Sequence, residues 1–158
     1  MTMKPASVSL IKSELKNAHP SQLVDICLRM AKFKLENKEL LTYLLFEVED
    51  EPSYIRDIKL EMEELFAAMN LQSLYLAKKT IRKVLRYINK YIRISGQKIT
   101  EVELRMHFCR ILNESDLRID QNRVVKNIYE RECERIQKAI NGLHEDLQYD
   151  YTEELNKL

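Results

Sequence analysis

Glycine and proline are scarce in this sequence. Its 158 residues include two glycines and three prolines, far fewer than an average chain of that length would carry. Tight turns in β-hairpins need glycine at positive φ, so a hairpin-rich β protein would lack turn residues here. Two glycines also cannot supply a Walker loop or a G-x-G-x-x-G fingerprint, and neither pattern occurs. Nucleotide binding by those two routes is therefore excluded.

Long apolar runs are also missing. The longest apolar block covers residues 40–46 and is interrupted by Thr42, whereas a membrane span needs about 20 predominantly apolar residues. The first 16 residues contain no long apolar stretch, so we expect no secretory signal. The chain has an odd number of cysteines, and they are widely spaced: Cys27, Cys109 and Cys133. This pattern predicts free thiols that serve as small core residues. We therefore expect a cytoplasmic protein without a membrane partner.

No catalytic or metal-binding pattern can be recognised. His19, His107 and His144 are scattered, and no pair of ligands has the spacing of a zinc site. No cysteine or serine lies in a nucleophile signature. Acidic pairs such as residues 63–64 are typical of solvated helix faces. These absences predict a protein that is not an enzyme and that uses no metal and no cofactor.

The residues that are abundant favour helix. Leucine, isoleucine, glutamate, lysine and arginine dominate, and most of them have high helix propensity. Apolar residues recur at helical spacing along nearly the whole chain. The sequence predicts a single all-α domain over residues 1–158 with about six or seven helices. The helices are expected to pair as antiparallel hairpins that form either a short α-α superhelix or a helical bundle. The acidic tail, residues 148–158, is expected to be frayed or a short extra helix.

Capping residues suggest where several helices begin. The first helix is expected over residues 7–17, and Pro20 suits the first position of the second. Asn37, Ser53 and Asp120 are candidate caps of later helices, and Thr100 with Glu103 has the spacing of a capping box. In the second helix one apolar stripe is expected to face a core. Its members are Leu23, Ile26, Cys27, Met30 and Phe33.

Charge is distributed unevenly, although the net charge is only +1. Residues 65–100 contain eight lysines and arginines and no acidic residue, whereas residues 47–64 contain eight acidic residues and two basic ones. The tail, residues 141–158, contains five acidic residues and one basic one. Such asymmetry is informative about partners rather than about fold.

The helix expected over residues 73–94 carries a basic stripe opposite its apolar face. At about 100° per residue its cations fall within a sector of roughly 100°, with Tyr75 on the same side. Asp57, Glu61 and Glu64 form an acidic stripe on the preceding helix. The basic stripe consists of Lys79, Arg82, Lys83, Arg86, Lys90 and Arg93.

Three interpretations of the basic stripe remain open: a solvated face, a contact surface for nucleic-acid phosphates, and a surface that docks an acidic protein partner or a second copy of the chain. Single-strand binding relies on stacked aromatic residues, and Tyr75 is the main candidate. No helix-turn-helix spacing is recognisable either. We therefore rank a protein-interaction or scaffold module first and a nucleic-acid-binding protein second.

Three segments carry a resemblance to known sequences. Residues 37–47 (NKELLTYLLFE), 73–79 (SLYLAKK) and 143–151 (LHEDLQYDY) resemble a family of uncharacterised all-helical proteins from Bacteroidetes-type bacteria. The likeness extends over nearly the whole chain. It implies a bacterial cytoplasmic protein, and it implies no activity, cofactor or partner.

Overall fold

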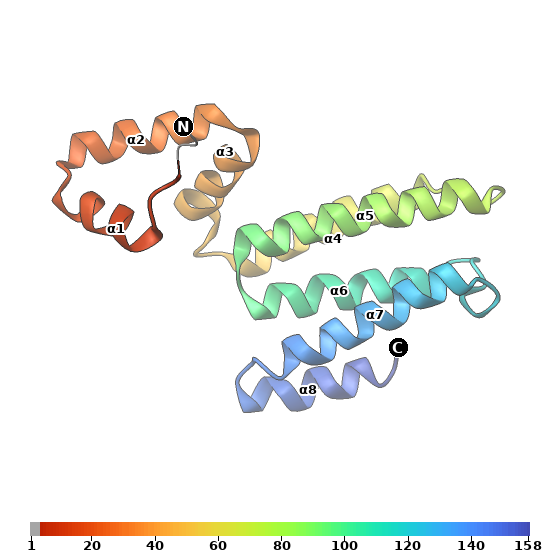
Figure 1. Cartoon of the computed structure of the whole chain (residues 1–158). Coiled ribbons are helices and arrows are strands. Elements are labelled where there is room, and N and C mark those ends of the chain that lie inside the picture. The colour runs from red at the N-terminus through yellow and green to blue at the C-terminus, as the bar shows by residue number, and fades with distance from the viewer. Residues whose placement is uncertain (1–3) are drawn as a thin grey trace. The chain divides into compact units, whose positions relative to one another are not determined.

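The computed structural model describes residues 4–158, and this part of the chain is all-helical (Figure 1). Helix accounts for 81% of the chain, so the predicted all-α class is confirmed. Eight α-helices are present in the described residues, one more than the upper expected number, because the acidic tail also forms a helix. They are α1 (Val8–Asn17), α2 (Pro20–Phe33), α3 (Leu35–Thr42), α4 (Glu51–Ala67), α5 (Leu74–Ser95), α6 (Lys98–Glu114), α7 (Arg123–Ile140) and α8 (Glu145–Leu155).

The chain divides into two compact units, where the sequence led us to expect one domain. Unit 1 is Met1–Phe46 and unit 2 is Glu47–Leu158. Unit 1 contains α1 to α3 and most of a π-helical turn over Tyr43–Glu47, and unit 2 contains α4 to α8. Each unit is described separately below.

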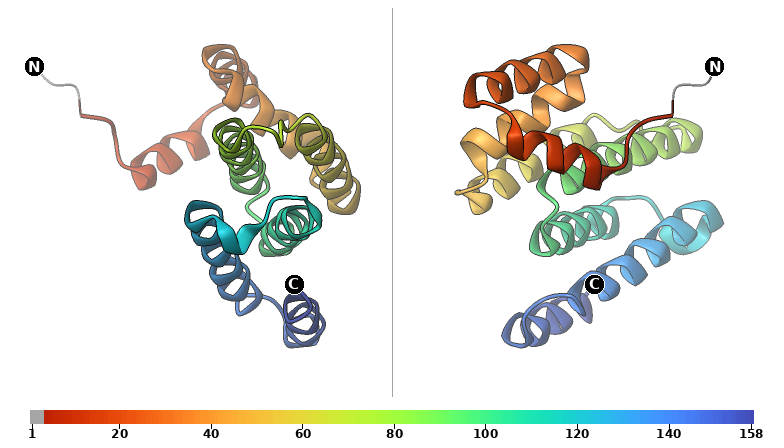
Figure 2. Two further views of the ribbon diagram at one scale, coloured as in Figure 1. Left: turned by 90° about the vertical axis from the view of Figure 1, so that its right-hand side faces the viewer. Right: turned by 60° about the vertical axis from the view of Figure 1, so that its left-hand side comes forward.

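In unit 2 the helices that follow each other in sequence pack against each other. The α4–α5 and α6–α7 pairs are in contact, as the short connections predicted, and α2 packs on α3 in unit 1. Two further contacts, α4 with α6 and α5 with α6, join the pairs of unit 2. Helix α8 packs on α7 and so lies at the end of this arrangement, as Figures 1 and 2 show.

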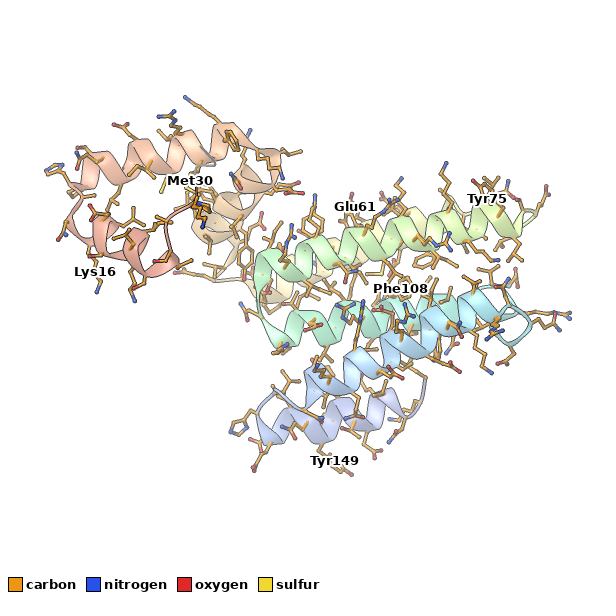
Figure 3. All side chains as sticks on the ribbon, in the orientation of Figure 1. Lys16, Met30, Glu61, Tyr75, Phe108 and Tyr149 are labelled. Atoms are coloured by element: carbon orange, nitrogen blue, oxygen red, sulfur yellow. The ribbon has the colours of Figure 1, made fainter. Side chains whose placement is uncertain are left out.

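Unit 2 has a continuous apolar core to which every helix from α4 to α7 contributes. Phe66 of α4 and Phe108 of α6 pack with their ring centroids 5.6 Å apart, and Phe108 is labelled in Figure 3. The largest completely enclosed side chains of this core, apart from Phe108, are Met62, Ile81, Val84, Ile88, Val102, Leu104, Leu112, Val125, Ile136 and Ile140. This core fixes the faces that α4 and α5 turn to solvent.

Helix α5 was expected over residues 73–94 and covers Leu74–Ser95. The Ser73 side chain accepts a hydrogen bond from the Leu76 N–H at the N-terminus. At the C-terminus Gly96 adopts φ 68°, a left-handed conformation that strains residues with a Cβ. Both ends of α5 are therefore fixed by local sequence.

Other predicted helix starts are wrong. Asn37 lies inside α3, where its amide donates to the Met30 carbonyl at 2.9 Å. Helix α6 begins at Lys98, so Thr100 is inside it and donates to the buried Glu51 instead of forming a capping box. The cap of α7 is Asn122, and Asp120 lies in a short 3₁₀ turn before it. In α4 the cap is Asp50, three residues before Ser53. Thr100 forms its hydrogen bond with a residue of another helix, and spacing along the sequence does not reveal such contacts.

Unit 1 lacks the buried face that its apolar stripe predicted. Between residues 4 and 46 the only buried side chain is Tyr43, at 2% exposure. Ile26, Cys27, Met30 and Phe33 of α2 are exposed, and only Leu23 of that stripe is partly covered. The helical period correctly grouped these residues on one face, but most of that face stays exposed in unit 1.

Candidate interaction surface

Helix α5 separates an apolar inner face from a basic outer face. Ala77, Ile81, Val84 and Ile88 have no exposed surface, and they recur at the three- and four-residue steps of one helix face. Within α5 every charged residue is basic. Because the inner residues are locked in the core of unit 2, the cations between them are held on the opposite side.

Five members of the basic stripe are exposed. Lys79, Arg82, Lys83, Arg86 and Arg93 all lie in the exposed class. In residues 4–158 no ion pair joins any of these five to a carboxylate. From Lys79 to Arg93 the stripe extends about 21 Å along the helix axis at 1.5 Å per residue. The structure thus brings together the site residues that the sequence singled out.

Lys90 is the exception within the stripe. Its side chain is partly buried, and its Nζ lies 4.6 Å from the centroid of the Tyr91 ring. A cation at that distance over an aromatic face is held by the ring quadrupole. We had expected Lys90 to point outward with the other cations; instead it is committed in part to an intramolecular contact, and a partner would reach it less easily.

Tyr75 adds an apolar element to one end of the stripe. It is 76% exposed in the first turn of α5 and is labelled in Figure 3. The neighbouring side chains of Leu71, Leu74 and Leu76 are exposed as well. Tyrosine and arginine, which lie side by side here, are enriched among the residues that contribute most of the binding energy of protein interfaces.

A shallow groove of about 550 Å³ runs along the same helix. Lys79, Arg82 and Arg86 line it together with Tyr75, Leu85 and Asn89. The lining combines three cations, one aromatic ring, one apolar side chain and one amide. Such a surface can accept anionic groups along its length while the Tyr75 ring and Leu85 contact apolar atoms.

An acidic stripe on α4 lies next to the basic stripe. The Tyr87 hydroxyl of α5 donates to Glu61 Oε2 of α4 at 2.6 Å. Burial, and then the hydrogen bond to that carboxylate, raise the pKa of Tyr87 well above its usual value, so the phenol keeps its proton. Asp57, Glu61 and Glu64 are exposed. The two stripes are thus exposed side by side along neighbouring helices, joined at Tyr87.

Tyrosine side chains hold this α4–α5 border together. The Tyr91 ring lies 4.7 Å from that of Tyr87 and 6.3 Å from that of Tyr54, measured between centroids. The Tyr54 hydroxyl also donates to the Tyr91 carbonyl at 3.1 Å. Sequence reasoning missed this cluster, although Tyr87 and Tyr91 are four residues apart and therefore share a helix face.

Outside the basic stripe, lysine and arginine side chains of unit 2 form ion pairs within the chain. Lys59 Nζ lies 2.5 Å from Glu103 Oε2, and Tyr151 of α8 donates to the same carboxylate. Burial alone would raise the pKa of Glu103, but the hydrogen bonds from Lys59 and Tyr151 hold it below its usual value. Tyr151 lies in the tail that was expected to be frayed or to form a short extra helix; the tail forms the helix α8, and this contact holds α8 against α6.

Two of the three cysteines are in contact. Cys109 of α6 is buried and Cys133 of α7 is partly buried. The hydrogen bond between the thiols lowers the pKa of Cys133 to about 7 and, with burial, raises that of Cys109, so the proton stays on Cys109. Cys27 is exposed, so the expectation of a core residue is wrong for it. Spacing along the chain gave no sign of the Cys109–Cys133 contact.

Over residues 4–158 no group of three or more histidine, cysteine or acidic side chains is placed to hold a metal ion. None of the helices in the described chain has the length and apolarity needed to cross a membrane.

Comparison with known proteins finds no match for this chain among protein-family models, curated proteins or solved structures.

Proposed function

We propose that this protein is a non-catalytic interaction module that docks an acidic surface of a protein partner on the basic stripe of α5. The observation that carries the proposal is the set of five exposed cations without an intramolecular ion pair. Like charges at i, i+4 cost a few tenths of a kcal/mol per pair in an isolated helix. A stripe that destabilises its own helix slightly and pairs with nothing nearby is best explained by an external partner.

The neighbouring acidic stripe favours a protein over a nucleic acid. A phosphate backbone laid along α5 would meet Asp57, Glu61 and Glu64 at its edge, which are exposed on α4 and repel it. A protein partner can present acidic groups to α5 and basic groups to α4. Paired patches of opposite sign fix the register of such a complex and raise its association rate.

Nucleic-acid binding is the second candidate, and one observation favours it. Tyr75 lines the same groove as Lys79, Arg82 and Arg86. Aromatic rings beside a cationic track are the means by which single strands are held without sequence preference. A test of the proposed function therefore has to include both kinds of polyanion.

Charge reversal on the stripe tests the proposal. The variant K79E/R82E/K83E/R86E changes four exposed side chains and should keep its fold. We expect its affinity for fluorescent poly-L-glutamate, measured by anisotropy at low salt, to fall at least about tenfold, or 1.4 kcal/mol. A matched control, R118E/R123E/R131E/K138E, makes the same charge change at exposed positions on and before α7, and it should retain most of the wild-type affinity.

Two outcomes would contradict the proposal. If both variants lose binding equally, net charge and not the stripe governs the contact. If a 20-base-pair duplex or a single strand binds the wild type more tightly than polyglutamate at physiological salt, the nucleic-acid alternative replaces ours. In that case the logarithmic salt slope should approach the number of phosphates neutralised.

A further inference from the structure

The two cysteines of unit 2 face each other across the contact between α6 and α7. These helices pack on each other (Figure 1). Cys109 of α6 has no exposed surface, whereas Cys133 of α7 is partly exposed. The two thiols share a hydrogen bond. A small solute can therefore reach one thiol of the pair from solvent, and the second thiol lies directly behind it.

Polar contacts on either side of the cysteine pair hold the two helices in register. The Asn113 amide of α6 donates to the Tyr129 hydroxyl of α7 at 2.8 Å. Each of these residues is four positions, about one helical turn, from the cysteine of its own helix. One turn to the other side along α6, Arg105 lies 2.6 Å from Glu132, the neighbour of the α7 cysteine. These contacts keep the two sulfurs opposite each other.

The spacing of packed helices permits a disulfide at this position. Helices that pack on each other have axes about 8–10 Å apart, and their Cα atoms lie about 2.3 Å from each axis. Facing Cα atoms are then about 3.5–5.5 Å apart, a range that overlaps the roughly 4.4–6.8 Å spanned by disulfides. Two facing thiols that share a hydrogen bond can thus be joined without a large movement of either helix.

We propose that Cys109 and Cys133 form a reversible oxidation site, at which a small hydroperoxide oxidises Cys133 and Cys109 then closes a disulfide between α6 and α7. A small peroxide is the class of oxidant that fits, because Cys133 is only partly exposed. No residue of the basic stripe takes part, so this inference is independent of the function proposed for α5.

The two thiols differ in the way that this reaction requires. The thiolate is the form of cysteine that attacks a peroxide. Hydrogen bonds from Cys109 and, to a smaller degree, from Tyr129 lower the pKa of Cys133 to about 7, against the opposing effects of burial and of Glu132 and Glu130. The pKa of Cys109 is raised by the same hydrogen bond and by burial, so this thiol keeps its proton. Cys133 is therefore oxidised first, and Cys109 is the resolving cysteine.

The oxidation consists of two balanced steps. The Cys133 thiolate attacks one oxygen of the peroxide and the O–O bond breaks. Sulfur loses two electrons and becomes a sulfenic acid, and the leaving hydroxide takes a proton from solvent. The Cys109 thiol then attacks that sulfur: the S–S bond forms, the S–O bond breaks, and the hydroxyl leaves as water with the Cys109 proton. An added dithiol reverses the modification by thiol–disulfide exchange.

Peptide mapping of the oxidised full chain tests the site. The variant C27S removes the exposed cysteine of unit 1 and so prevents links through it. After treatment with hydrogen peroxide, C27S should lose about 2 Da, the mass of two hydrogens, and give a peptide pair that links Cys109 to Cys133. Dithiothreitol should reverse both changes. The initial rate should rise roughly tenfold from pH 5 to pH 6 and level off above about pH 8, because the thiolate is the reactive form.

Two further variants in the C27S background separate the roles of the two thiols. C109S removes the resolving thiol, so oxidation should stop at the sulfenic acid of Cys133, which dimedone traps. C133S removes the thiol that reacts first, so the buried Cys109 should be oxidised at least about tenfold more slowly than the pair. Each variant is the matched control of the other, since both replace one sulfur with oxygen at the same helix contact.

Three results would overturn the inference. Oxidation of Cys133 to sulfinic acid in C27S, with no link to Cys109, would show that the thiols do not meet in solution. Equal oxidation rates of Cys109 with and without Cys133 would remove the assigned roles. A rate that keeps rising above pH 9 would show that Cys133 is not activated. If C109S or C133S does not fold, the map and the pH profile of C27S remain decisive.

Discussion

Replacing Arg105 with alanine is expected to destabilise unit 2 by about 3–5 kcal/mol. Arg105 of α6 is 6% exposed and Glu132 of α7 is 2% exposed, and their closest atoms are 2.6 Å apart. Arg105 also contacts Glu101 at 3.1 Å. Removing the guanidinium leaves the Glu132 carboxylate buried with only Arg135, 2.9 Å away, to compensate it. Equilibrium urea denaturation followed by circular dichroism measures the loss.

Two further variants separate the buried charge from simple loss of packing. The double variant R105M/E132L replaces the ion pair with apolar groups of similar volume, and it should recover most of the stability. R131A removes an exposed arginine next to Glu132 in the sequence of α7, and it should change the free energy of unfolding by less than about 0.5 kcal/mol. A loss below 1 kcal/mol for R105A would mean that water reaches Glu132 in solution.

The second large effect on stability is expected in α5. Replacing one of two adjacent residues with alanine should cost several kcal/mol, and replacing the other should cost almost nothing. Ile81 has no exposed surface, whereas Arg82 beside it is exposed. Ile81→Ala leaves a cavity in the core of unit 2 and should cost about 2–5 kcal/mol. Arg82→Ala should change stability by less than about 0.5 kcal/mol. The same denaturation measurement compares the two.

This contrast bears on function as well as on stability. If Arg82→Ala proves as costly as Ile81→Ala, the basic stripe would serve the fold, and the argument for an external partner would fail. If only Ile81→Ala lowers the free energy of unfolding, the exposed Arg82 is dispensable for folding. The position of Arg82 in the basic stripe is then more simply explained by binding.

Helix α5 shows how much of this structure could be predicted from sequence. Its apolar period is a local signal that predicted its inner face, and the expected bounds, residues 73–94, agree with Leu74–Ser95 to within one residue. The basic stripe followed from the same period. What could not be predicted is the behaviour of Lys90 and Tyr87. Glu61 reaches Tyr87 from α4, and the ring that holds Lys90, that of its neighbour Tyr91, packs against Tyr54 of α4.

The errors on α6 and α2 have two physical causes. Thr100 and Glu103 have capping-box spacing, yet Glu51 and Lys59 from α4 engage them, and those contacts span more than 40 residues. On α2 the period identified residues that share a face. It carried no information on whether the chain itself covers that face, and unit 1 leaves it exposed.

The most direct measurement of where α5 is used is an NMR titration. Backbone amide shifts of ¹⁵N-labelled protein would be followed as poly-L-glutamate is added. We predict that the perturbed residues cluster between Tyr75 and Arg93, on the exposed side of α5 around Lys79, Arg82 and Arg86. Perturbations confined to α7, or spread evenly over all exposed lysines and arginines, would contradict the assignment of the basic stripe as the docking surface.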